Sequence, residues 1–234
     1  MAYRTRSNAR AWHAITFAIA LLAVILQLVL VIQGGQHLSS ETDPDVQVGS
    51  PGLATRIIRF CSYLTIWSNV AAMVIVGTLV LDPARDGRVW RAFRLFSTVV
   101  LFGGGIVHFV LLRPILDLHG ADLLADKLLH VVVPILVVIG WVVFGPRHRV
   151  GPEDLWRFVA ITVVWFAYTL VRGGFVDWYP YPFLDVNEHG YGAVLGIGVG
   201  IGVAMAALGW LAYWLDRRLP AGEYDARTRL PARG

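Results

Sequence analysis

Two polar side chains within otherwise apolar stretches could together carry out nucleophilic chemistry. Thr65 lies in 61-CSYLTIWSNV-70, and His130 lies in 122-DLLADKLLHVVVP-134. An alcohol is a weak nucleophile unless an adjacent base takes its proton as it attacks. Histidine suits that role because its ordinary pKa is about 6.5. The pair predicts a threonine nucleophile and a histidine base that attack an ester or a similar carbonyl compound.

Neighbouring polar residues could assist this pair. Asp126 precedes His130 by four residues, so on a helix the carboxylate could orient the imidazole. Ser62, Thr65 and Asn69 are spaced i, i+3, i+7 and would share one stripe, with Asn69 as an oxyanion donor. Each residue also has a structural interpretation. Serine and threonine bond back to helix carbonyls, asparagine joins helices, a buried histidine is often simply hydrogen-bonded, and Asp126 could be a solvated helix end.

The elements that must position these residues are membrane helices. Of the 234 residues, 56% are hydrophobic and 15% are charged, and the mean hydropathy is +0.61, which excludes an ordinary soluble domain. A bilayer crossing needs about 20 apolar residues. We predict an all-α bundle, a single membrane domain over residues 1–234, with spans at about 12–34, 57–81, 90–113, 122–144, 155–172 and 191–215 and a short tail over 216–234.

The placement of the basic residues predicts the orientation of the bundle. With both termini in the cytoplasm, most of the 20 basic residues face inward, as the positive-inside rule requires of a multi-pass plasma-membrane protein. The first apolar run is longer than a signal-peptide core of about 7–15 residues, so we expect it to remain in the protein. Thr65 and His130 each lie eight residues from the outer start of their span, about 12 Å deep at 1.5 Å per residue.

Several classes of partner and cofactor are not expected. The net charge is +4, which could indicate a nucleic-acid partner. The arginines cluster in short segments between apolar runs, however, and do not form one basic stripe with aromatic residues between them, so no nucleic-acid partner is predicted. Cys61 is the only cysteine, which excludes an internal disulfide and a cysteine-cluster metal site. The threonine–histidine mechanism requires no metal and no dissociable cofactor. The expected partners are the bilayer and a lipid or fatty-acid ester, and the oligomeric state is left open.

The outer loop 173–190 contains 178-WYPYPFLD-185, which is rich in aromatic residues and prolines. Tryptophan and tyrosine at this level are common membrane anchors. Because proline stiffens the backbone, the loop could instead form a lid or rim over a site that opens outward. We therefore assign substrate binding to Tyr181 and Asp185 here, to Arg172, which could snorkel or bind an acidic headgroup or a carboxylate, and to His108.

Two other classes of function stay open. The polar stripe could serve only to pack helices in a lipid-binding or transport protein, although no internal repeat of the transporter kind is visible. His108 and His130 could ligate a haem, or the protein could act on a quinone, but one histidine pair is fewer than electron transfer across a membrane usually uses. The glycines of 196-GIGVGIG-202 lie within an apolar run, which favours helix packing over phosphate binding.

Three segments carry a family resemblance. The stretches 63-YLTIWSNV-70 and 129-LHVVVPIL-136, and above all 179-YPYPFLD-185 followed by Gly190-Tyr191, resemble the bacterial Pr6Pr membrane proteins. These look like distant relatives of the androgen-induced gene 1 and androgen-dependent TFPI-regulating proteins of animals. The resemblance covers roughly residues 15 to 215. It implies a six-span hydrolase of esters between fatty acids and hydroxy fatty acids, with the nucleophile at Thr65 and the histidine at His130.

The chain departs from the pattern of the animal proteins at three places. Their proline lies one residue further from the histidine than Pro134 lies from His130, and a second histidine stands where this chain has Leu128. The segment 66-IWSN-69 replaces a more apolar stretch that carries an acid. The expectation is therefore a hydrolase of lipid-like esters whose exact substrate is left open.

Overall fold

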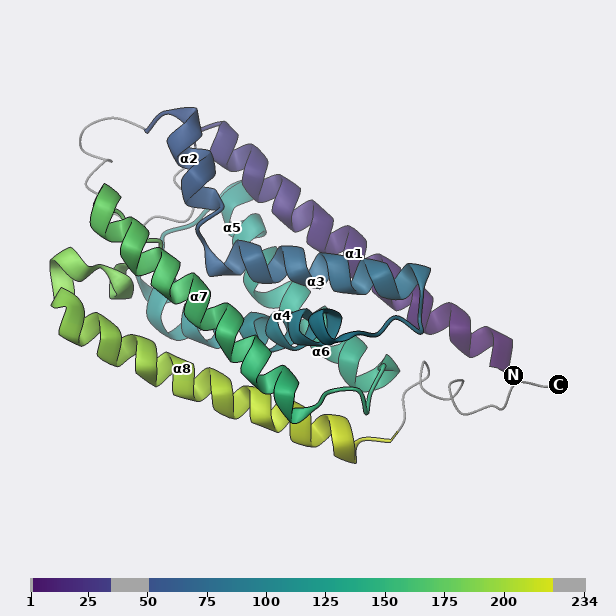
Figure 1. Ribbon diagram of the computed structural model, residues 1–234. Helices are drawn as coiled ribbons and strands as arrows, with labels where there is room; N and C mark the ends of the chain where they lie inside the picture. Colours follow the sequence, from purple (N-terminus) through teal and green to yellow (C-terminus); the bar gives the residue numbers. More distant parts are fainter. Residues whose placement is uncertain (1, 35–50, 221–234) are drawn as a thin grey trace.

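The computed structural model describes residues 2–34 and 51–220, and within them the chain is all-α, with six helical spans long and apolar enough to cross a membrane (Figure 1). The predicted six-helix architecture is confirmed. The elements are α1 (Ala2–Ile32), α2 (Leu53–Phe60), α3 (Leu64–Leu81), α4 (Arg88–Val107), the π-helical η2 (His108–Leu112), η3 (Arg113–Ile115), α5 (Gly120–Lys127), the π-helical η4 (Leu128–Val132), α6 (Val133–Ile139), the π-helical η5 (Gly140–Phe144), α7 (Pro152–Val176), η6 (Pro182–Leu184) and α8 (Val186–Arg218).

Helix α4 lies at the centre of the bundle. It packs against α3 on one side and against α7 and α8 on the other, and α1 runs along α3 (Figure 1). One apolar cluster joins α1, α3 and the η4–α6 segment, including Leu129 and Val133. A second joins α4, α7 and α8 through Phe96, Phe158 and Met205. The start of α1 and the end of α8 lie at the same end of the bundle, as an even number of spans requires.

Most of the predicted spans begin or end a few residues from the expected positions. The observed spans are Asn8–Ile32, Leu64–Leu81, Arg88–Ile115, Gly120–Phe144, Pro152–Val176 and Val186–Arg218. The last helix starts earlier than residue 191 because the Asp185 side chain accepts hydrogen bonds from the amides of Asn187 and Glu188. Gly190 then bends this helix with φ of 74°, a conformation that glycine adopts without steric cost.

The prediction of one continuous helix over 57–81 is wrong. The helix is interrupted at Cys61–Tyr63, and α2 lies at an angle to α3 (Figure 1). The Ser62 carbonyl accepts a hydrogen bond from the indole Nε1 of Trp165, at 2.9 Å, and so does not continue the helix. The Tyr63 side chain is buried against Trp178. These contacts with distant segments end α2 although the local sequence stays apolar.

The end of the bundle at which α1 starts and α8 ends contains buried charges (Figure 1). Asp154 is fully buried and pairs with Arg91 and Arg157 at 3.0 and 2.7 Å. Asp216 is also fully buried and accepts hydrogen bonds from the amide N–H groups of Arg149 and Val150. The predicted tail therefore begins after Arg218 and not at residue 216. Its residues 221–234, and residues 35–50 of the predicted loop after the first span, lie outside the described residues.

Candidate active site

Thr65, near the start of α3, and His130, in η4, lie together in the bundle. The Thr65 hydroxyl Oγ1 is 3.3 Å from His130 Nε2, across the interface between α3 and η4. This distance allows the hydroxyl to donate its proton to the imidazole. The contact that a threonine–histidine pair requires is present, although Thr65 is the second residue of α3 and does not lie eight residues into a longer helix.

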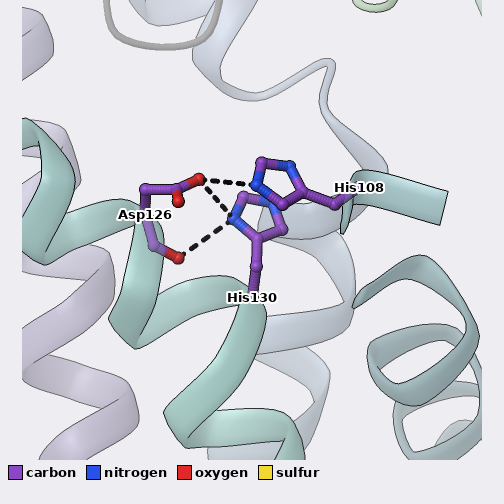
Figure 2. Close-up of side chains that lie close together, drawn as sticks. All are labelled: His108, Asp126 and His130. Carbon is purple, nitrogen blue, oxygen red and sulfur yellow. Dashed lines mark hydrogen bonds and ion pairs between the residues drawn. The ribbon is translucent and has the colours of Figure 1, made fainter. Parts of the chain in front are cut away.

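Asp126 lies against two imidazole rings (Figure 2). Its Oδ1 atom is 3.0 Å from His130 Nδ1 and 2.9 Å from His108 Nε2, and the Asp126 backbone carbonyl is 3.1 Å from the same His130 Nδ1. All three side chains are buried, with exposed fractions of 7% for Asp126, 9% for His130 and 6% for His108. With Nδ1–H of His130 held by these oxygens, its Nε2 lone pair faces the threonine. Thr65, His130 and Asp126 thus have the geometry of a hydroxyl, an imidazole and an orienting carboxylate in a relay.

The two histidines are both carried by π-helical segments. His108 begins η2 and His130 is the third residue of η4. Such segments insert an extra residue into a helical turn and occur frequently at functional sites. The local widening of both helices brings the two rings into a face-to-face stack, with ring centres 3.7 Å apart and planes 6° from parallel.

Tyr181 reaches the same threonine from the loop before α8. Its hydroxyl Oη lies 3.3 Å from Thr65 Oγ1 and accepts a hydrogen bond from the Thr65 backbone N–H at 3.4 Å. That N–H has no partner within the helix because Thr65 is in the first turn of α3. Burial raises the pKa of the Tyr181 phenol above its ordinary value, so the hydroxyl keeps its proton. A phenolic O–H, positioned by the Thr65 backbone N–H, therefore lies beside the Thr65 hydroxyl.

An apolar cavity of about 150 Å³ opens from these groups into the bundle. Thr65, His108, His130 and Tyr181 form part of its polar wall. The remaining wall is mostly apolar and comes from α3, α4, η4, α7 and α8 and from the segment before α8. It includes Val100, Leu101, Gly104, Leu129, Val163, Phe166, Leu184, Gly198, Ile201, Gly202 and Met205. The arrangement suits a molecule with one polar reacting group and a hydrocarbon portion.

Asp126, His108 and His130 also resemble a donor set for a metal ion, since the relevant atoms lie within 4.8 Å of one another. A metal ion bound to imidazole lies in the plane of the ring, about 2.0–2.1 Å from the nitrogen. The two ring planes here are stacked and nearly parallel, so they do not meet at a point within that reach. The stack also leaves no space for a haem between the two histidines, which would have to approach iron from opposite faces. The geometry fits proton transfer better than metal or haem ligation.

The other residues selected from the sequence have structural contacts. Asn69 is fully buried, and its Nδ2 donates to the carbonyls of Thr65 and Leu129 at 2.8 and 3.4 Å. It joins α3 to η4 and so fixes the positions of Thr65 and His130, while its amide N–H groups are already used and do not face an oxyanion. Ser62 lies in the break between α2 and α3, and its hydroxyl donates to the Ile58 carbonyl at 2.7 Å. The predicted stripe of three residues is therefore wrong for Ser62.

Arg172 and Asp185 do not line the cavity. The Arg172 guanidinium carbon lies 5.2 Å from the centre of the Trp178 ring, and Arg59 lies 4.9 Å from the same ring. Asp185 caps α8. The prediction that these two residues contact substrate therefore has no support from the cavity. The Arg172 side chain stacks on Trp178, and the Asp185 side chain caps α8.

Sequence reasoning missed two features of the site. The contact of His108 with Asp126 was not predicted, although an i, i+4 spacing revealed the contact of His130 with the same carboxylate. The glycines Gly104 and Gly202, which make room for the cavity, gave no local signal beyond their small size. Of the glycines in 196–202, Gly198 is packed, against Phe166, whereas an added Cβ at Gly196, Gly200 or Gly202 would meet nothing within 4 Å.

Comparison of the chain with protein-family models, with curated proteins and with solved structures gives no match. The functional assignment therefore depends on the geometry of the site.

Proposed function

We propose that this protein is an intramembrane hydrolase of lipid-like esters, with Thr65 as nucleophile and His130 as general base. The observation that carries the proposal is the relay from Asp126 Oδ1 through His130 to Thr65 Oγ1, with distances of 3.0 and 3.3 Å, at the wall of an apolar cavity. A hydroxyl hydrogen-bonded to an imidazole that a carboxylate orients is the arrangement that activates alcohols for acyl transfer.

The first chemical step forms an acyl-threonine. Thr65 Oγ1 attacks the ester carbonyl carbon while His130 Nε2 takes the hydroxyl proton, and the carbonyl oxygen becomes an oxyanion. The Tyr181 O–H, whose oxygen lies 3.3 Å from Thr65 Oγ1, is the donor that would stabilise this oxyanion. Hydrogen bonds that strengthen as charge develops lower the barrier, and they do so more in an apolar cavity than in bulk water. The oxyanion then collapses, the ester C–O bond breaks, and the alkoxide takes up a proton and leaves as the alcohol. Water then hydrolyses the acyl-threonine and regenerates the hydroxyl.

Tyr181→Phe is expected to lower kcat by about 100-fold with little change in KM, because the hydroxyl acts mainly on the oxyanion. Phenylalanine keeps the ring that packs on Tyr63 and Phe183. The matched control is Tyr168→Phe, whose hydroxyl contacts Ser62 and lies outside the cavity wall, and it should turn over ester like the wild type. A Tyr181→Phe variant with unchanged kcat would remove Tyr181 from the oxyanion site.

The cavity indicates which part of a substrate it holds. A volume of about 150 Å³ accommodates a molecule the size of benzene, so a segment of roughly six carbons fits within it. Val163, with 57% of its surface exposed, and the exposed Gly202 belong to the cavity wall and also to the outer surface of α7 and α8. A long acyl chain would extend between these two helices into the bilayer, which supports a lipid-like ester over a small polar one.

Gly202→Leu is expected to lower kcat/KM for esters with long acyl chains about tenfold or more, while esters of short acids are affected little. A Cβ at Gly202 has space, so the leucine can be accommodated and would occupy the path of the chain. Gly200→Leu is the matched control because Gly200 is also open and exposed but does not line the cavity. Rates for a series of chain lengths check this, and an equal effect of both substitutions would contradict the assigned path.

The proposal extends to the orientation of the protein. The basic residues favour a plasma-membrane protein with both termini in the cytoplasm. Helix α1 starts and α8 ends away from the start of α3, which carries Thr65 (Figure 1), so the catalytic residues would open towards the outer leaflet.

The experiment that tests the proposal is an assay of purified protein in detergent micelles with fatty-acid esters of different chain lengths. We expect release of the free acid at a rate proportional to the protein concentration. Wild-type protein that is folded but releases no acid from any of these esters would contradict the proposal.

A further inference from the structure

The His108 ring is a buried group of the site that the steps above do not use. Its exposed fraction is 6%, it lines the cavity, and within the part of the chain that the structure describes its Nδ1 atom has no hydrogen-bond partner. A buried polar atom without a partner is costly, and at the wall of a binding cavity it points to a ligand. His108 Nε2 is already beside Asp126 Oδ1, at 2.9 Å (Figure 2).

The charges of the cluster indicate how many protons it holds. A buried carboxylate without a compensating positive charge is strongly unfavourable. One proton added to the two imidazoles balances the charge of Asp126. A second would place two like charges in rings whose centres are 3.7 Å apart. The stack is therefore suited to one imidazole and one imidazolium.

The proposed mechanism assigns the extra proton to His108 at rest. His130 must be neutral because its Nε2 lone pair accepts the proton of Thr65. His108 then carries the positive charge and offers Nδ1–H as a donor. We infer that His108 is a second catalytic histidine, which gives its Nδ1 proton to the departing alkoxide of the ester while His130 takes the proton of Thr65. This inference rests on the proposed ester hydrolysis and assigns acid and base to different rings.

The proton balance closes over one turnover. In acylation the Thr65 Oγ–acyl bond forms, the ester C–O bond breaks, His130 gains a proton and His108 loses one. In deacylation neutral His108 takes a proton from the attacking water, the acyl–Thr65 bond breaks, and the His130 imidazolium returns its proton to Thr65 Oγ. The pair of rings holds one extra proton before and after each half, so the charge opposite Asp126 never changes.

Esters with different leaving groups test this division of roles. A nitrophenyl ester releases a weakly basic oxyanion that needs no proton, whereas an alkyl ester of the same acid releases a strongly basic one. For His108→Gln we expect alkyl-ester turnover to fall by about 100-fold. With the nitrophenyl ester we expect a burst of about one equivalent of nitrophenolate, followed by slow turnover while the acyl-threonine accumulates, which intact mass would detect.

Two further variants keep the test independent of folding. His108→Phe keeps an aromatic ring against His130 but has no proton to give, and it should show the same burst and the same loss on the alkyl ester. His119→Gln is the matched control, since His119 is 81% exposed at the side chain, and it should behave like the wild type. Thermal unfolding of each variant in detergent verifies that the bundle is intact.

The outcomes separate the two proposals. Suppose that wild type hydrolyses both esters. If the His108 variants are then acylated more slowly by the alkyl and the nitrophenyl ester to the same extent, or are slowed with neither, the acid role of His108 is overturned while the hydrolase function stands. If folded wild type hydrolyses neither ester and forms no acyl-threonine, the hydrolase function itself fails, and the role of His108 with it.

Discussion

Thr65→Ala abolishes ester hydrolysis, with kcat expected to fall by about a thousandfold or more. Removing the nucleophile of an acyl-transfer relay leaves only the contribution of oxyanion donors and of substrate binding. The bundle should remain folded because the Thr65 side chain is only partly buried and its backbone carbonyl, which binds Asn69, is kept. The measurement is release of free acid in detergent, together with thermal unfolding of each protein.

Two controls make this prediction specific. Thr65→Ser keeps the hydroxyl and should retain much of the activity. Ser68→Ala removes another hydroxyl of the cavity wall, one that donates to the Thr65 carbonyl at 3.0 Å, and should change kcat only by a few-fold. An alanine variant at residue 65 that keeps more than a tenth of the wild-type rate would contradict the role of the threonine as nucleophile.

His130→Gln is expected to cause a loss of similar size, about a thousandfold or more, because the hydroxyl then has no base. Residues that act as one unit show non-additive effects. The double variant with Thr65→Ala should therefore be no slower than Thr65→Ala alone. Steady-state kinetics of the three proteins check this.

Independent, multiplicative losses in this cycle would mean that Thr65 and His130 do not act in the same step. In that case the 3.3 Å contact between them would be a structural hydrogen bond between α3 and η4.

Much of the fold could be predicted from the sequence because a bilayer requires about 20 apolar residues in each crossing helix. Each apolar run became a span, and errors of a few residues arose at the ends. The break at Cys61–Tyr63 was missed because it depends on the indole of Trp165, about a hundred residues away, which binds the Ser62 carbonyl. Local hydropathy does not predict a contact between residues so far apart in the sequence.

The candidate site was partly predictable for a related reason. Polar groups at membrane depth are costly, so Thr65, Asp126 and His130 were conspicuous, and an i, i+4 spacing joined the last two. The place of His108 was not predictable from a regular helix. Its ring meets Asp126 where two π-helical segments face each other, and an extra residue in a turn rotates the side chains that follow by about 100° relative to a regular helix.

Covalent labelling tests the central claim most directly. Purified protein is treated with a long-chain fluorophosphonate, and its intact mass and the labelled peptide are measured for wild type, Thr65→Ala and His130→Gln. An activated threonine predicts one adduct, at Thr65, in the wild type and none in either variant. Folded wild-type protein that takes up no label, while a control hydrolase does, would contradict an activated Thr65, as would an adduct that persists in Thr65→Ala.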